Sequence, residues 1–164
     1  AFAEAIERHN CIERRSIEFT ILGDIAEQYR TSLAALSCVK LLERQTHAEC
    51  LNAMKAADLL YLPLAFGKQS NRISRYSMPT KLPEYLASGK TVLFHAPADS
   101  AVFKVAERHD LTPRLATTSP KALDRFVEDW ASCRVRSTTP GARTAILEEF
   151  DIDRLSRDFQ AAFI

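Results

Sequence analysis

Glycine is scarce in this chain, whose 164 residues contain only four, at Gly23, Gly67, Gly89 and Gly141. No two of them lie close together in the sequence. This excludes the G-x-G-x-x-G dinucleotide fingerprint and the G-x-x-x-x-G-K-[ST] phosphate loop. A phosphate-binding site in this chain would therefore have to use some other element than a glycine-rich loop.

Net charge is also nearly absent. Lys and Arg number 22 against 21 Asp and Glu, which leaves +1. A chain so balanced has no overall basic field that would attract nucleic acid or an anionic membrane, so we expect no nucleic-acid partner. Arg134, Arg136 and Arg143 form a local basic run. A solvated connector is a simpler interpretation of this run than a site for an acidic partner or a membrane surface.

Cysteine motifs and long apolar runs are lacking as well. The four cysteines form no C-x-x-C pair, and no His and Cys residues have zinc-finger spacing, so we expect reduced cytosolic thiols and no metal site. No apolar run approaches the roughly 20 residues that span a bilayer. The first residues, AFAEAIERHNC, do not resemble a signal peptide and lack an initiator Met. We therefore expect a cytoplasmic location for a piece of a longer or processed chain.

What is present is an ordinary globular composition, with 46% hydrophobic and 26% charged residues, and a length that suits one domain over residues 1–164. Apolar runs that predict strands alternate with periodic segments that predict helices. This order predicts an α/β fold with a Rossmann-like, doubly wound parallel sheet. The expected strands cover 17–22, 39–42, 59–62, 91–95 and 111–117, and the expected helices cover 2–10, 25–36, 46–57, 78–88, 99–108, 119–131 and 142–163.

Three local patterns strengthen the predicted helix boundaries. Thr46 and Glu49 have the spacing of a capping box, in which each side chain bonds the backbone amide of the other residue. Asp99 and Ser100 precede an apolar periodic segment and are expected to cap it, which is a simpler role than a catalytic dyad. Gly89 follows the predicted helix over 78–88 and suits the position just beyond a helix end.

The most informative stretch is a polar loop over 65–77, followed by MPTKLPEYLASG. Loops of this length are often functional. The predicted helix start, with Pro79 near its first position, offers free amides and a partial positive charge to a phosphate or diphosphate. Thr80 adds a hydroxyl, Lys81 adds a cation, and Glu84 lies four residues from Thr80, where a carboxylate can accept ribose hydroxyls. The spacing alone slightly favours a plain helix cap and a solvated Glu84.

The stretch MPTKLPEYLASGKTVLFHAP resembles the donor-binding segment of GT-B glycosyltransferases, in particular the retaining group 1 (GT4-like) enzymes. AADLLYLPLAF and FTILGD resemble the strands that precede it in that family, so the resemblance extends in order from about residue 17 to 163. It implies the nucleotide-sugar-binding half of a hexosyltransferase-type enzyme of polysaccharide biosynthesis. The donor would be a nucleotide-diphosphate sugar, and the acceptor a glycan or a lipid-linked molecule.

The resemblance also assigns roles to single residues. Glu84 matches the ribose-binding glutamate, and Met78, Pro79 and Thr80 match the segment that holds the donor diphosphate, with Lys81 beside it. Glu43, Arg44 and Gln45 match the segment that contacts the base. The family uses amides and cations rather than a metal, so no cofactor is implied. The acceptor side would come from an N-terminal domain, and the parent protein could associate with the inner face of the membrane. The present chain alone is expected to be inactive.

Two departures from the family pattern leave alternatives open. Tyr76 stands eight residues before Glu84, where the family has a glutamate that contacts the donor sugar, so sugar recognition must differ or be absent. The family's first strand has no match, which predicts an altered sheet order, a gap filled by another chain, or a part of the polypeptide outside this sequence. A non-catalytic binding or regulatory module of the same fold and an epimerase-like domain are the alternative functions.

Three further residues have two open interpretations each. His95, at the end of a predicted strand, either contacts a phosphate or sugar or is a plain strand-end histidine. Arg72 and Arg75 in the polar loop either reach phosphate oxygens or keep the loop soluble.

Overall fold

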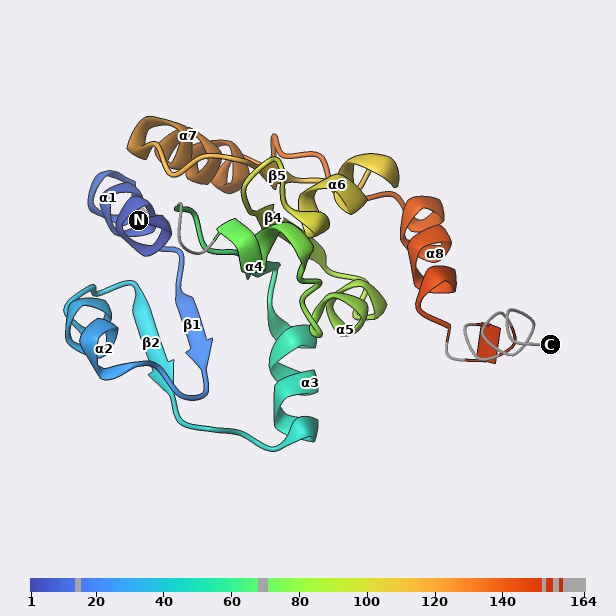
Figure 1. Cartoon of the computed structure of the whole chain (residues 1–164). Coiled ribbons are helices and arrows are strands. Elements are labelled where there is room, and N and C mark those ends of the chain that lie inside the picture. The colour runs from blue at the N-terminus through green and yellow to red at the C-terminus, as the bar shows by residue number, and fades with distance from the viewer. Residues whose placement is uncertain (14–15, 68–70, 152, 155–156, 158–164) are drawn as a thin grey trace. The chain divides into compact units, whose positions relative to one another are not determined.

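The computed structural model describes residues 1–13, 16–67, 71–151, 153, 154 and 157. It is a mixed α/β chain in which every strand pair is parallel (Figure 1). The chain divides into two compact units. Unit 1 comprises Ala1–Ala53 and Thr117–Val135, and unit 2 comprises Met54–Ala116 and Arg136–Ile164.

Unit 1 contains a two-stranded parallel sheet, with Phe19 opposite Val39 and Leu22 opposite Leu42. Its first helix packs against its last one, side by side in Figure 1. Phe2 lies at this contact, with its ring centroid 6.2 Å from that of Phe126. The elements are α1 (Phe2–Ile12), β1 (Phe19–Leu22), α2 (Glu27–Ala34), β2 (Val39–Leu42) and α7 (Pro120–Ala131), and α3 (His47–Ala56) leads from unit 1 into unit 2.

Unit 2 contains a three-stranded parallel sheet in the order β3, β4, β5. The middle strand carries Val92, Leu93 and Phe94, whose side chains are buried. Its near-continuous apolar sequence suits a strand covered on both faces, which is typical of parallel sheets. The elements are β3 (Leu59–Pro63), α4 (Asn71–Tyr76), α5 (Leu82–Ala87), β4 (Thr91–His95), α6 (Ala101–Arg108), β5 (Arg114–Leu115) and α8 (Pro140–Glu149).

The local capping predictions are confirmed. The Thr46 amide donates to the Glu49 carboxylate at 2.8 Å, and the Glu49 amide donates to the Thr46 hydroxyl at 3.3 Å. The Phe103 amide donates to the Ser100 hydroxyl at the start of α6. Gly89 follows α5 with a φ of +78°, a left-handed conformation that glycine adopts without steric cost.

Two predictions around the polar loop need correction. Residues expected to be loop form α4, a six-residue helix that is too short to produce a clear periodic pattern. The next helix, α5, begins at Leu82, because Pro79–Leu82 forms a turn in which the Leu82 amide donates to the Pro79 carbonyl at 3.1 Å. Pro83, and not Pro79, is therefore the proline in the first turn of that helix.

The ends of other elements also differ from the prediction. The last strand is only two residues long. The helix expected over 142–163 is seen as α8, with most of the later residues outside the described part. Residues 2–12 are helical and supply no strand. The described strands form two sheets, in which β1 pairs only with β2 and β3 only with β4, and this departs from one regular doubly wound sheet, as expected. The single domain over 1–164 stays a prediction.

Candidate functional site

The carboxyl ends of β3 and β4 lie next to each other in unit 2. Pro63 at the end of β3 is in register with His95 at the end of β4. The next amide, that of Leu64, donates to the His95 carbonyl at 2.9 Å. Because ligands of open α/β sheets bind outside the carboxyl ends of strands, the segment that leaves β3 here is the best candidate for a site.

This segment leads through α4 to the turn Pro79–Leu82. The side chains of Thr80 and Lys81 are exposed, and their backbone amides donate to no acceptor within the described residues. Lys81 occupies the N-cap position of α5 and makes no side-chain capping bond. The turn therefore presents two open amides, a hydroxyl and an ammonium group, which are suitable donors for a phosphate group. Met78 and Pro79, which precede them, are half-buried.

Glu84 lies in the first turn of α5, where its side chain is partly exposed. No cation pairs with its carboxylate in the part of the chain that the structure describes. An ionised carboxylate has only acceptor positions, so Glu84 can receive two hydroxyl hydrogen bonds from a ribose. The structure places Thr80, Lys81 and Glu84 on one short stretch of unit 2.

The predicted base-contacting residues follow β2 and belong to unit 1. Glu43 and Arg44 are exposed, and the Gln45 amide nitrogen donates to the Glu43 carbonyl at 3.0 Å. This hydrogen bond is local, and the side chains of Glu43 and Arg44 stay open to solvent. Convergence of these residues with the turn in unit 2 stays a prediction.

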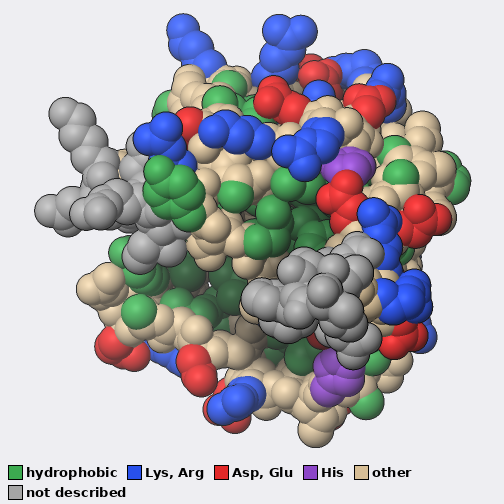
Figure 2. All heavy atoms as spheres, turned by 45° about the vertical axis from the view of Figure 1, so that its right-hand side comes forward, with side chains coloured by type: hydrophobic (Ala, Val, Ile, Leu, Met, Phe, Trp, Pro, Cys, Tyr) green, Lys and Arg blue, Asp and Glu red, His purple; other side chains and the backbone are tan. Residues whose placement is uncertain are grey.

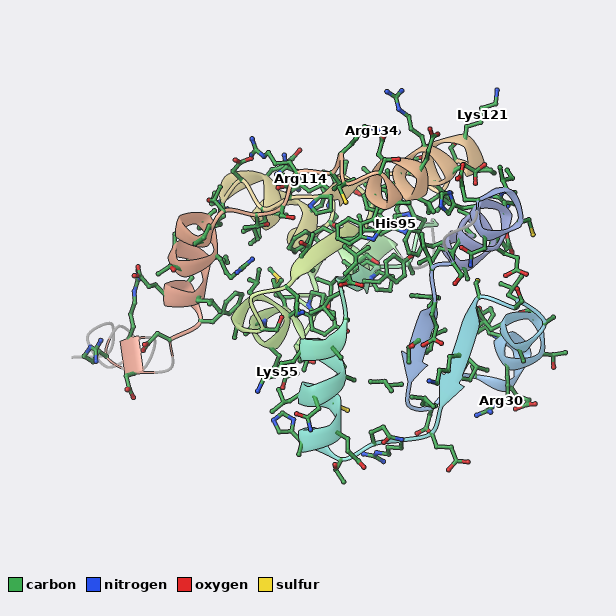
Figure 3. All side chains as sticks on the ribbon, turned by 180° about the vertical axis from the view of Figure 1, so that it is seen from behind. Arg30, Lys55, His95, Arg114, Lys121 and Arg134 are labelled. Atoms are coloured by element: carbon green, nitrogen blue, oxygen red, sulfur yellow. The ribbon has the colours of Figure 1, made fainter. Side chains whose placement is uncertain are left out.

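His95 is only 3% exposed and packs inside unit 2 (Figure 3). Its Nδ1 lies 2.7 Å from the Tyr61 hydroxyl, and its ring centroid lies 5.0 Å from that of Phe66. Burial raises the pKa of the Tyr61 phenol well above its usual range, so this hydroxyl stays protonated. The burial of the ring favours the strand-end interpretation of His95 over direct contact with a ligand.

Tyr76 ends α4 and is 78% exposed. The Arg75 guanidinium carbon lies 5.8 Å from the centroid of the Tyr76 ring, within range of a cation–π contact. Both side chains are exposed, so Arg75 is accessible to an anion. The side chain of Arg72 lies outside the described residues.

Sequence reasoning missed Tyr61, Phe66 and Ser74, which surround the start of the segment. Tyr61 belongs to the apolar strand Leu59–Pro63, where its hydroxyl has no sequence pattern that sets it apart. Ser74 is 3% exposed, although the stretch NRISRYS in which it lies is mostly polar. Contacts between distant residues identify all three, and no local signal could have found them.

The described residues include neither a cluster of metal ligands nor a membrane-spanning helix. Among them no group of three or more His, Cys, Asp or Glu side chains could hold a metal ion. No helix in this part of the chain is long and apolar enough to cross a bilayer. On the face shown in Figure 2, Lys and Arg side chains lie beside Asp and Glu side chains.

The chain was also compared with known proteins. It matches no protein-family model and no curated protein sequence. The resemblance to GT-B glycosyltransferases therefore stays a prediction that depends on the residues and their local geometry.

Proposed function

We propose that this chain is the donor-binding part of a retaining glycosyltransferase, which transfers a sugar from a nucleotide-diphosphate sugar to a glycan or lipid-linked acceptor. The observation that carries the proposal is the turn Pro79–Leu82. It has two open amides at Thr80 and Lys81 and is followed within one helical turn by Glu84. Diphosphate and ribose are adjacent in a nucleotide, as the groups suited to bind them are adjacent here.

Each residue has a distinct role in this proposal. The amides of Thr80 and Lys81, with the Lys81 ammonium, stabilise the negative charge that develops on the leaving diphosphate. Glu84 accepts hydrogen bonds from the ribose hydroxyls. Glu43, Arg44 and Gln45 contact the base, and no metal is needed because amides and a cation supply the charge stabilisation. The acceptor is bound by an N-terminal domain of a cytoplasmic parent protein.

The strand pairings give independent support. A doubly wound sheet of order 3-2-1-4-5-6 has its first strand in the middle. Removing that strand leaves a pair and a trio, each parallel, with the same order as β2–β1 and β3–β4–β5. We infer that these strands correspond to strands 2 to 6 of a Rossmann-like domain of the GT-B type.

Calorimetric titration with UDP, GDP and ADP tests the proposal. We expect one of the three nucleotides to bind, and Glu84→Ala to weaken its binding about tenfold or more, because hydrogen bonds to charged groups contribute about 1.5–3 kcal/mol. Glu107→Ala is the matched control, since Glu107 is an exposed carboxylate on α6 of the same unit. Absence of heat with all three nucleotides, or equal effects of the two substitutions, would contradict the proposal.

A second candidate is a non-catalytic module of the same fold. Tyr76 favours it, because an exposed aromatic ring stands where the resembled enzymes have a carboxylate that holds the donor sugar. Such a module would bind nucleotide without supporting transfer. Sugar transfer by the parent polypeptide with Tyr76 intact would exclude this candidate.

A further inference from the structure

The segment between β3 and the turn Pro79–Leu82 is held at its beginning by His95. The backbone of His95 accepts a hydrogen bond from the Leu64 amide at 2.9 Å, and its ring packs against Phe66 with a centroid distance of 5.0 Å. The ring is itself held by the Tyr61 hydroxyl, 2.7 Å from Nδ1. The backbone and the ring of the buried His95 therefore hold residues 64–66, the first three after β3.

The same segment is held a second time by Ser74 in α4. The Ser74 hydroxyl donates to the carbonyl of Ala65 at 3.1 Å, across nine positions of sequence. Ser74 is 3% exposed, so the donor of this hydrogen bond is shielded from water, although Ala65 itself is exposed. Because Ala65 lies between Leu64 and Phe66, the two attachments meet, and α4 is fixed relative to the end of β4.

Only Ser77 and Met78 separate the end of α4 from Pro79. Tyr76 and Pro79 are therefore three Cα steps apart, which span at most about 11 Å when the chain is extended, so the position of α4 restricts where the turn can lie. If this segment is already ordered before a ligand arrives, less conformational entropy is lost on binding.

We propose that Ser74 and His95 are positioning residues, which keep residues 64–67 and α4 folded against the sheet so that the open amides of Thr80 and Lys81 are in place before an anion binds. The binding consequence rests on the proposed function, with a nucleoside diphosphate as the ligand. The ordering of the segment is independent of the proposed function. If the segment is ordered in only a fraction of the molecules, the apparent Kd equals the Kd of the ordered form divided by that fraction.

The test combines hydrogen exchange with calorimetry on the whole chain. In Ser74→Ala the Ala65 carbonyl loses its shielded donor, so we expect amides of residues 64–67 and 74–77 to exchange severalfold faster while those of β4 keep their protection. The nucleotide that binds the wild-type chain should bind about fivefold to tenfold more weakly, as expected for the loss of one hydrogen bond.

Thr138→Val is the matched control. Thr138 is also buried, and its hydroxyl donates to the Thr112 carbonyl and accepts from the Thr112 amide, both at 2.8 Å, so its hydrogen bonds lie at another place in unit 2. We expect this variant to leave exchange of residues 64–77 and nucleotide affinity unchanged. Phe66→Ala serves as a second variant because it removes the ring contact with His95 and leaves the Ser74 hydrogen bond to Ala65 in place.

The outcomes separate the two proposals. If the wild-type chain binds none of the nucleotides but Ser74→Ala accelerates exchange, the proposed function fails and the ordering role remains. If the wild-type chain binds a nucleotide and both Ser74→Ala and Phe66→Ala keep wild-type exchange and affinity, the positioning role is overturned. Equal loss of affinity in Thr138→Val would overturn it too, since the effect would then be one of general stability.

Discussion

The carboxylate of Glu7 in α1 accepts a hydrogen bond from the backbone amide of Cys38 at 2.8 Å, just before β2. It also accepts bonds from the amide and the hydroxyl of Ser37, at 3.1 Å and 2.8 Å. One side chain thus joins the first helix of unit 1 to its sheet. These bonds, that of the Ser37 hydroxyl first, lower the pKa of Glu7 from 4.5 to about 2.

This hydrogen bonding predicts a stability that depends on pH. A carboxyl group whose folded pKa is depressed stabilises the fold above its unfolded pKa of 4.5, and this stabilisation is lost as the pH falls from there towards 2. Glu7→Gln should lower stability at pH 7 and reduce its fall between pH 5 and pH 2. Urea unfolding measured at several pH values checks this. Glu4→Gln, an exposed position on the same helix, should keep the wild-type fall, and an unchanged profile in Glu7→Gln would contradict the prediction.

Cys38 is expected to be an unreactive thiol. It is 4% exposed, and burial, with the Glu7 carboxylate beside it, raises its pKa to about 12. Since the thiolate is the reactive form, Cys38 should resist alkylation by iodoacetamide at pH 8 in the folded protein, whereas the exposed Cys11 and Cys133 should react. Mass spectrometry of peptides from treated protein measures each site. Modification of Cys38 as fast as Cys11, before unfolding, would show that the site is open.

The Tyr61 hydroxyl should contribute measurably to the stability of unit 2. Tyr61→Phe removes the hydrogen bond to His95 Nδ1 while it keeps the ring, and should cost about 1 kcal/mol. The midpoint of urea unfolding should fall with little change in slope. Tyr29→Phe is the control, because Tyr29 is 57% exposed and its loss of a hydroxyl should have almost no effect. Equal midpoints for the two variants would refute the role of the Tyr61 hydroxyl.

Two glycines should respond in opposite directions to replacement by alanine. Gly89 has a φ of +78°, a backbone conformation that is unfavourable for a residue with a side chain. Gly89→Ala should therefore lower the free energy of unfolding by about 1 kcal/mol or more. Gly141 lies in α8, and a Cβ there would meet nothing within 4 Å. Gly141→Ala should therefore stabilise by about 0.4–1 kcal/mol. Thermal unfolding of both variants gives the comparison, and a shift of the same sign in both would contradict the conformational argument.

Features that depend on neighbouring residues were predictable from the sequence. The capping box of Thr46 and Glu49, the Ser100 cap and the glycine after α5 formed as expected, because each requires only residues within about one helical turn. That Thr80, Lys81 and Glu84 together bind a nucleotide stays a prediction. The start of α5 was misplaced by the pattern, since a turn at Pro79 and a helix with Pro79 in its first turn look alike in sequence.

The sequence by itself determined the α/β class and most strand positions, since composition and short-range patterns specify these. Only the tertiary structure decided that His95 is buried against Tyr61 and Phe66, and that Ser74 bonds Ala65. It also decided that the strands form a pair and a trio. These features depend on which distant residues meet, and that choice is made by packing and hydrogen bonding across the folded chain, which no local pattern of residues specifies.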